Sequence, residues 1–162
     1  MKLQLIKKIV NHLNEELDIL LVAANNAHLA ATDDQSIAET QYDTLAIEAG
    51  YLAEGQSRRV DELKDAIASF EQLSEVIIKS PSNHNQVQLG SIVQLSKDQI
   101  VNQYFFIAPA AAGFRCMIED KSFTVITPQS PMGKALINKI LDDEVSIQLG
   151  NSQLNDEIIY IE

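Results

Sequence analysis

The chain has 162 residues, of which 46% are hydrophobic, and it carries a formal net charge of −11 at pH 7. A hydrophobic content of this size indicates a folded core and argues against a disordered chain. The acidity argues against direct binding to duplex nucleic acid, because the neutralisation of phosphates needs a basic face. It points instead to a basic protein surface, a metal ion or solubility as the reason for the charge.

Apolar residues recur at steps of three and four along two stretches, which predict helices over residues 2–31 and 37–79. Each stripe can bury the other if the chain folds back, so we expect an antiparallel coiled-coil hairpin about 45 Å long, at ~1.5 Å per residue. Gly50 and Gly55 interrupt the second stripe and suggest a close helix approach or a slight bend. The two stripes consist of Ile6, Ile9, Val10, Leu13, Leu17, Leu20, Leu21, Ala24, Ala27 and Ala31, and of Leu45, Ala49, Leu52, Gln56, Val60, Leu63, Ile67, Phe70, Leu73 and Ile77.

Carboxylates gather in the segment that joins the two helices, near residues 32–43. Ser36 and Glu39 have the spacing of a capping box at the start of the second helix, and acidic residues there also interact favourably with the helix dipole. These structural roles stand beside a functional one, because the segment lies at the end of a long rod. The four carboxylates are Asp33, Asp34, Glu39 and Asp43.

The composition changes at residues 80–86, a polar, proline-bearing stretch that we interpret as a linker between the hairpin (1–79) and a second domain (87–162). There the apolar period becomes strand-like, which predicts an antiparallel sheet, and Ser130 and Pro131 mark the start of one short helix as its N-cap and first residue. The fold class is therefore α+β. The expected strands are 91–95, 103–107, 114–118, 123–126, 144–149 and 157–161.

Several features bear on the environment of the protein. Its single cysteine, Cys116, excludes an internal disulfide and, with apolar neighbours, is typical of a buried thiol in a reducing compartment. The longest apolar run, residues 19–24, is too short to span a bilayer. Glu15, Glu16 and Asp18 fall where a signal peptide would be apolar. We therefore expect a cytoplasmic protein.

Arg58 has Glu54 and Glu62 at helical i,i+4 spacing, whereas Arg59 has no partner at that spacing.

The sequence resembles the Gre-type transcription factors of bacteria over nearly its whole length, and is most like the short Gre-like subgroup. The most specific part is the run Ile126-Thr127-Pro128-Gln129-Ser130-Pro131-Met132-Gly133-Lys134-Ala135-Leu136. Further resemblance lies in Glu39-x-x-Tyr42-Asp43-Thr44, Glu48-Ala49-Gly50-Tyr51-Leu52-Ala53, Gln56-x-x-Arg59, Tyr104-Phe105-Phe106-Ile107-Ala108-Pro109, Gly113 and Asp143-Glu144-Val145.

The resemblance implies an accessory factor that binds RNA polymerase and is not itself an enzyme. Its FKBP-like C-terminal domain would dock at the rim of the secondary channel through Gln129, Ser130 and Pro131. The hairpin would enter the channel, where tip carboxylates, Asp34 and Glu39 above all, would share a magnesium ion with the polymerase and promote cleavage of backtracked transcripts. Carboxylate oxygens are the ligands that magnesium prefers, and such a metal can activate water.

The tip departs from the pattern of the cleavage-competent members, which is Asp-x-x-Glu. Alignment on Tyr42 places Gln35 and Ala38 at those two positions, and the nearest carboxylates, Asp34 and Glu39, are each displaced by one residue. Because a misplacement of about 1 Å can cost on the order of a hundredfold in rate, binding without cleavage, as a competitor or inhibitor, stays open beside stimulation of cleavage.

Two other hypotheses remain. An FKBP-like domain could act as a prolyl isomerase or a peptide-binding chaperone, for which Tyr104, Phe105, Phe106, Phe114 and Phe123 would supply aromatic side chains. The hairpin could also drive self-association, although we expect a monomer, whose two apolar stripes satisfy each other.

Overall fold

The computed structural model describes residues 1–32, 44–79, 85–150 and 152–162. The chain forms two compact units, one made of Met1–Val10 with Ala68–Glu162 and the other of Asn11–Ile67. The first unit thus combines the sheet with the start of the first long helix and the end of the second. The division into a hairpin (1–79), a linker (80–86) and a C-terminal domain (87–162) stays a prediction about the sequence, and residues 80–84 lie outside the described ones.

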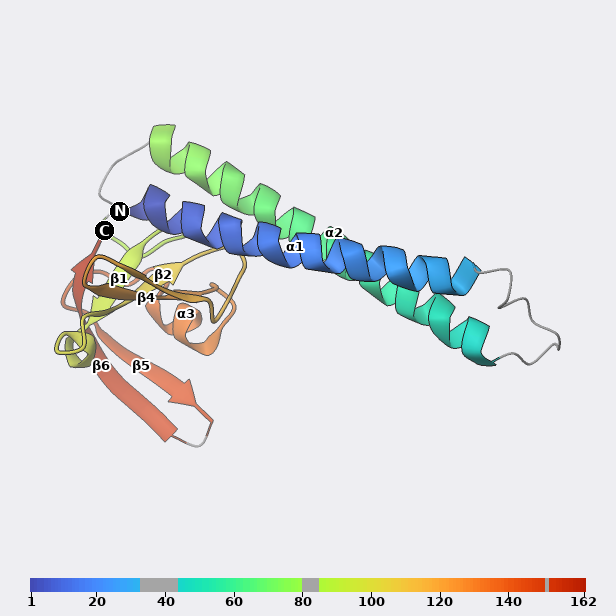
Figure 1. Ribbon diagram of the computed structural model, residues 1–162. Coiled ribbons are helices and arrows are strands. Elements are labelled where there is room, and N and C mark those ends of the chain that lie inside the picture. The colour runs from blue at the N-terminus through green and yellow to red at the C-terminus, as the bar shows by residue number, and fades with distance from the viewer. Residues whose placement is uncertain (33–43, 80–84, 151) are drawn as a thin grey trace. The chain divides into compact units, whose positions relative to one another are not determined.

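Two long helices, α1 (Lys2–Thr32) and α2 (Thr44–Lys79), account for most of the first half of the chain (Figure 1). The prediction of two long helices is confirmed. The predicted start of the second helix at residue 37, the preceding turn and the capping box of Ser36 and Glu39 all fall within residues 33–43, outside the described part of the chain.

Each helix buries one stripe of apolar side chains at the predicted spacing. The end of α2 and the start of α1 also border a common groove in the first unit, lined by Leu3, Ile6, Phe70 and Ser74 among others, as an antiparallel pair requires. A Cβ built on Gly55 meets nothing within 4 Å among the described residues, which argues against a close helix approach at this glycine and leaves the predicted slight bend as a prediction. The buried stripes are Leu5, Ile6, Ile9 and Leu13 in α1, and Val60, Leu63, Phe70 and Leu73 in α2.

Six strands form one sheet in the order β3-β4-β2-β1-β6-β5. All six strands were predicted, and β6 begins five residues earlier than expected because its first half pairs with β5 in a hairpin. The strands are β1 (Ile92–Leu95), β2 (Gln103–Ile107), β3 (Arg115–Ile118), β4 (Lys121–Ile126), β5 (Glu144–Leu149) and β6 (Ser152–Ile161).

The sheet is mixed, and the expectation of a purely antiparallel sheet was wrong in one pair. β4 pairs with β2 in parallel, from Gln103 opposite Ser122 to Ile107 opposite Ile126. The chain leaves β2, forms the edge strand β3, and only then returns as β4 between them, so β4 runs in the same direction as β2. β2 is a nearly continuous buried run, as expected for a central strand that is covered on both faces.

One face of the sheet carries the main hydrophobic core, under the short helix α3 (Pro131–Leu136). Along each strand, every second residue points to this face. Leu136 is the fully buried contribution of α3, and Met132 and Ala135 pack beside it. The buried residues of this core are Val87, Val93, Leu95, Phe105, Ile107, Ile126, Leu136, Val145, Ile147 and Ile158.

The opposite face of the sheet is buried as well. Phe106 and Phe123 are fully buried although they alternate with residues of the main core. Helix α2 comes close to the turn before β1, since a Cβ on Gly90 would lie 3.1 Å from Leu73 Cδ1. Burial lowers the pKa of Lys2 in α1, and Glu162 partly offsets this effect. The first unit therefore has three layers: the helix ends, the sheet and α3.

Candidate functional site

The segment from Thr127 to Lys134, here called the Ser130 turn, connects β4 to α3 and contains the three predicted contact residues. Ser130 is the N-cap of α3 and Pro131 its first residue, as the sequence indicated. The Ser130 Oγ accepts a hydrogen bond from the Gly133 backbone N–H at 3.0 Å and donates one to the Thr127 carbonyl at 2.7 Å. The backbone N–H of Ser130 donates to the same carbonyl at 3.0 Å.

Gly133 makes this turn possible, a role that the sequence analysis did not assign. A Cβ at this position would lie 1.9 Å from the Thr127 carbonyl oxygen and 3.0 Å from the Ser130 Oγ. No side chain fits there without displacement of the backbone. A signal was present in the sequence, because a glycine in the first turn of a helix costs stability unless close packing requires it.

The Ser130 turn exposes a rigid and mostly uncharged surface to solvent. Gln129 and Pro131 are exposed, Ser130 is half-buried, and Lys134 adds one exposed positive charge. The Ser130 hydroxyl already makes two hydrogen bonds within the turn. A partner would therefore meet a surface of fixed shape and the Gln129 amide, and not a reactive group. Its chemistry is that of a contact surface.

The predicted tip residues, Asp33, Asp34, Glu39 and Asp43, lie outside the described residues, as do Gln35 and Ala38. Their predicted roles therefore stay predictions. Within the described ranges (1–32, 44–79, 85–150 and 152–162), no group of three or more His, Cys, Asp or Glu side chains could hold a metal ion. No helix among those residues is long and apolar enough to cross a membrane.

The aromatic side chains that an isomerase pocket would need belong mainly to the core. Phe106 and Phe123 are fully buried, and Phe105 and Tyr104 are only 8% and 7% exposed. The Tyr104 ring stacks on Phe123 with centroids 5.5 Å apart and meets the Tyr160 ring edge-on at 5.8 Å. These rings pack against one another within the protein, so the aromatic residues do not favour a peptide-binding pocket.

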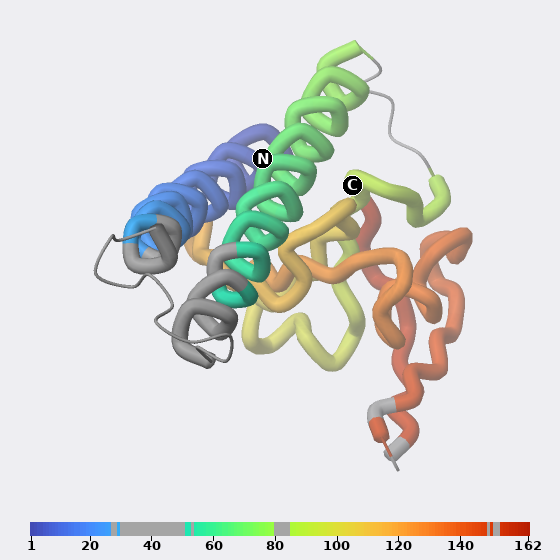
Figure 2. Tube along the Cα trace, turned by 90° about the vertical axis from the view of Figure 1, so that its right-hand side faces the viewer, coloured from blue at the N-terminus to red at the C-terminus, as the bar shows by residue number. Residues whose placement is uncertain are grey.

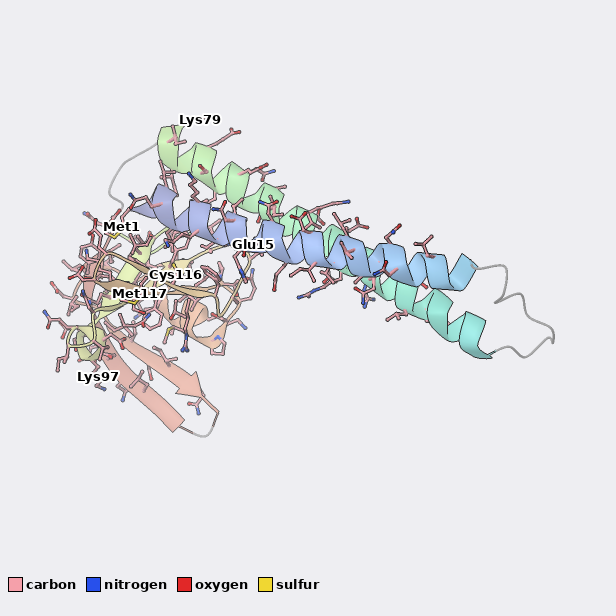
Figure 3. All side chains as sticks on the ribbon, in the orientation of Figure 1. Met1, Glu15, Lys79, Lys97, Cys116 and Met117 are labelled. Atoms are coloured by element: carbon pink, nitrogen blue, oxygen red, sulfur yellow. The ribbon has the colours of Figure 1, made fainter. Side chains whose placement is uncertain are left out.

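Cys116 on β3 is half-buried (labelled in Figure 3). Burial raises the pKa of its thiol, and the nearby Lys8 ammonium opposes that rise only in part. Because the thiolate is the nucleophilic form, this environment disfavours a reactive cysteine.

The two adjacent arginines share one carboxylate. Arg58 Nε lies 4.0 Å from Glu62 Oε1, and Arg59 Nη1 lies 3.4 Å from Glu62 Oε2. Arg59 has no carboxylate at i,i+4 spacing, as the sequence indicated, but it pairs with Glu62 at i,i+3 spacing. All three side chains are largely exposed, so these pairs contribute little to stability.

The C-terminal half of the chain matches a known protein family. Residues 82–162 match the family model described as transcription elongation factor, GreA/GreB, C-terminal. The chain is 31% identical to the transcription elongation factor GreA of Staphylococcus saprophyticus over 126 residues, which cover 75% of this chain and 69% of that protein.

Solved structures give a weaker likeness. The structure of the transcription factor Gfh1 aligns at 18% identity and a TM-score of 0.37, covering 94% of this chain and 92% of Gfh1. The GreA factor homolog 1 of Thermus thermophilus aligns at 18% identity and a TM-score of 0.36, covering 94% of each chain.

Proposed function

Because this chain belongs to the GreA/GreB family of transcription elongation factors, whose members are accessory factors rather than enzymes, we propose that it binds RNA polymerase and modulates elongation. The observation that carries the proposal is the match of residues 82–162 to the family model, since this region contains the Ser130 turn. The acidic net charge fits a basic protein surface as the partner.

The Ser130 turn is the proposed docking element at the rim of the secondary channel. Its hydrogen bonds and the close packing of Gly133 hold Gln129 and Pro131 in one arrangement before any partner arrives. A contact surface that is already ordered loses little conformational entropy on binding. This rigidity supports a role in positioning the rest of the chain.

The acidic segment between α1 and α2 is the proposed effector element. In this proposal the hairpin carries Asp33, Asp34, Glu39 and Asp43 toward the active centre of the polymerase. The donor chemistry fits a magnesium ion shared with the polymerase, with Asp34 and Glu39 as ligands, because carboxylate oxygens suit this hard cation. When bound, the ion would supply activation of a water molecule for transcript hydrolysis.

Gln35 and Ala38 favour a second outcome at the same site. They replace the two anionic positions of the cleavage-competent pattern, and neither can act as a charged ligand. A factor of this kind would occupy the channel and compete with cleavage factors without stimulating cleavage itself. Both outcomes require binding to the polymerase.

Binding to purified bacterial RNA polymerase tests the proposal directly. We expect saturable binding. Gln129→Arg should weaken the affinity about tenfold or more, because it places a bulky charge on the exposed surface of the Ser130 turn. Gln88→Arg is the matched control, because Gln88 is also exposed but lies in the segment before β1, outside both the Ser130 turn and the hairpin. Absence of binding by the wild-type chain would overturn the proposal, and equal loss in both variants would remove the Ser130 turn from it.

Stalled, backtracked elongation complexes separate the two outcomes. Accelerated transcript cleavage that is lost when Asp33, Asp34 and Glu39 are replaced by alanine supports the cleavage factor. Unchanged cleavage, together with inhibition of an added GreA, supports the competitor. Cleavage that survives the triple replacement would show that these carboxylates are not the effector groups.

A further inference from the structure

A polar cleft of about 620 Å³ lies in the first unit, and none of its lining residues belongs to the Ser130 turn. It is bordered on one side by the short 3-10 helix η2 (Ser96–Asp98) and on the other by the β5–β6 hairpin. Residues that line it and enter the argument are Ser96, Lys97, Glu144, Asn155, Asp156 and Glu157.

The cleft exists because β6 leaves β1. Their pairing shifts register between Gln94 and Leu95, and beyond Ile158 the first half of β6 pairs only with β5. The hairpin therefore extends away from the rest of the sheet, as the orange and red segments show in both Figure 1 and Figure 2. Helix η2 fills only part of the space that this separation leaves.

Asp156 carries a buried charge that the protein satisfies on one side only. The residue is 8% exposed. Its Oδ1 accepts hydrogen bonds from the Ser96 hydroxyl at 3.0 Å and from the backbone N–H groups of Lys97 and Glu157 at 3.3 and 2.9 Å. Its Oδ2 is buried and has no hydrogen-bond partner. A buried carboxylate oxygen without a donor is costly. This oxygen lies out of reach of solvent, so it adds negative potential to the cleft but offers no direct contact to a ligand.

Two further carboxylates line the same cleft. Glu144 and Glu157 stand directly opposite each other in the β5–β6 ladder, where like charges destabilise the pairing. Among the residues that the structure describes, no ion pair with Lys or Arg involves these two or Asp156. The Nζ of Lys97 (labelled in Figure 3) donates to the backbone carbonyl of Asn155 instead.

Asp98, which belongs to the same 3-10 helix as Ser96 and Lys97, interacts electrostatically with the Asp156 carboxylate. Burial and the Asp156 carboxylate together raise the pKa of Asp98 above its usual value. The described residues include no group of three or more candidate ligands that could hold a metal ion, and acidic groups repel phosphates. An organic cation therefore suits the cleft best.

We propose that this cleft receives an arginine side chain from a basic protein surface. A guanidinium offers five donors in a planar fork, which suits the exposed carboxylates of Glu144 and Glu157 better than an ammonium does. The identification of that surface as part of RNA polymerase rests on the proposed function, whereas the chemistry of the cleft does not. The chain would then contact its partner at two places in the first unit, the Ser130 turn and this acidic cleft.

A titration followed by the backbone amide signals of the full-length protein tests the cleft. The probe is an acetylated Gly-Arg-Arg-Gly peptide, compared with peptides in which citrulline or lysine replaces arginine. We expect saturable shifts at residues 96–98, 144–146 and 155–157 with arginine, weaker binding with lysine, and none with the uncharged citrulline. Equal shifts with citrulline, or shifts elsewhere only, would overturn the proposal, and equal affinity for lysine would overturn its choice of arginine.

Charge removal with a matched control completes the test. The double substitution Glu144→Gln, Glu157→Gln should weaken binding of the arginine peptide about fivefold or more, because each change removes one exposed charge from the cleft. Glu119→Gln with Asp120→Asn removes the same charge from the exposed β3–β4 turn and should leave affinity unchanged. Equal effects of the two pairs would refute the cleft as the binding site.

The same variants distinguish this inference from the proposed function. If the wild-type chain binds RNA polymerase and the Glu144→Gln, Glu157→Gln variant binds equally well, the cleft is not part of that interface and the proposed function stands. If the wild-type chain does not bind polymerase but the peptide titration saturates, the proposed function falls and the cleft remains a site for a cationic partner.

Discussion

The replacement of Gly133 by alanine provides the sharpest test of how the Ser130 turn is built. An added Cβ would lie 1.9 Å from the Thr127 carbonyl oxygen, whereas ordinary contact begins near 3.4 Å. The backbone would therefore have to move by about 1.5 Å, the difference between these two distances. That movement separates Thr127 from the Ser130 hydroxyl and breaks the 2.7 Å hydrogen bond between them.

The expected cost follows from the interactions that this movement disturbs. Overpacking typically costs roughly 1–3 kcal/mol, and loss of an N-cap about 1 kcal/mol. The higher helix propensity of alanine returns up to about 1 kcal/mol. We therefore expect Gly133→Ala to lower the free energy of unfolding by about 1–3 kcal/mol. For a unit of about a hundred residues this corresponds to a fall in melting temperature of roughly 5–15 °C.

Thermal and urea unfolding followed by circular dichroism measure this change, and Gly55→Ala is the matched control. The same substitution at Gly55, exposed within α2 with nothing near its Cβ position, should stabilise the protein by about 0.5–1 kcal/mol. A Gly133→Ala protein within about 0.5 kcal/mol of the wild type would refute the reasoning, because it would show that the turn relaxes at little cost.

Three more predictions concern the first unit, which contains the sheet and the ends of the two long helices. Phe70 is fully buried, so Phe70→Ala should lower the free energy of unfolding by about 3–5 kcal/mol in urea titrations, and a smaller loss would show that the helix ends are loosely packed. The raised pKa of Asp98 means that its ionisation disfavours the folded state, a penalty absent below pH 3.8 and complete once the pH exceeds the folded-state pKa. Asp98→Asn should therefore raise the melting temperature at pH 7 but not near pH 3, and an equal effect at both values would contradict this assignment. Burial and the hydrogen bond to Glu162 raise the pKa of Tyr160 to about 12, so Tyr160→Phe should remove the latest step in the phenolate absorbance titration, and its persistence would assign that step to another tyrosine.

Local sequence signals were sufficient to predict the features that depend on the residues of a single helix or strand. Steps of three and four between apolar residues predicted both long helices, because a helix stripe depends only on its own residues. Ser130 and Pro131 predicted the start of α3, since a cap and a fixed φ angle act within one turn. The same holds for β2 and β5, whose observed bounds equal the predicted ones.

Pairing between distant segments needed the tertiary structure. The parallel alignment of β2 with β4 depends on where the chain places β3, and turn residues alone do not encode that choice. The need for glycine at position 133 follows from the Thr127 carbonyl, which the fold brings back against the first turn of α3. The acidic cleft likewise unites η2 with residues nearly sixty positions later.

The sequence by itself determined the two helices, the strands, the short capped helix and the acidic character of the chain, because each is a property of neighbouring residues. Only the tertiary structure decided the mixed sheet, the close packing around Gly133 and the unpartnered oxygen of Asp156. These features depend on which surfaces exclude water from one another, and that is settled by contacts between residues far apart in the chain.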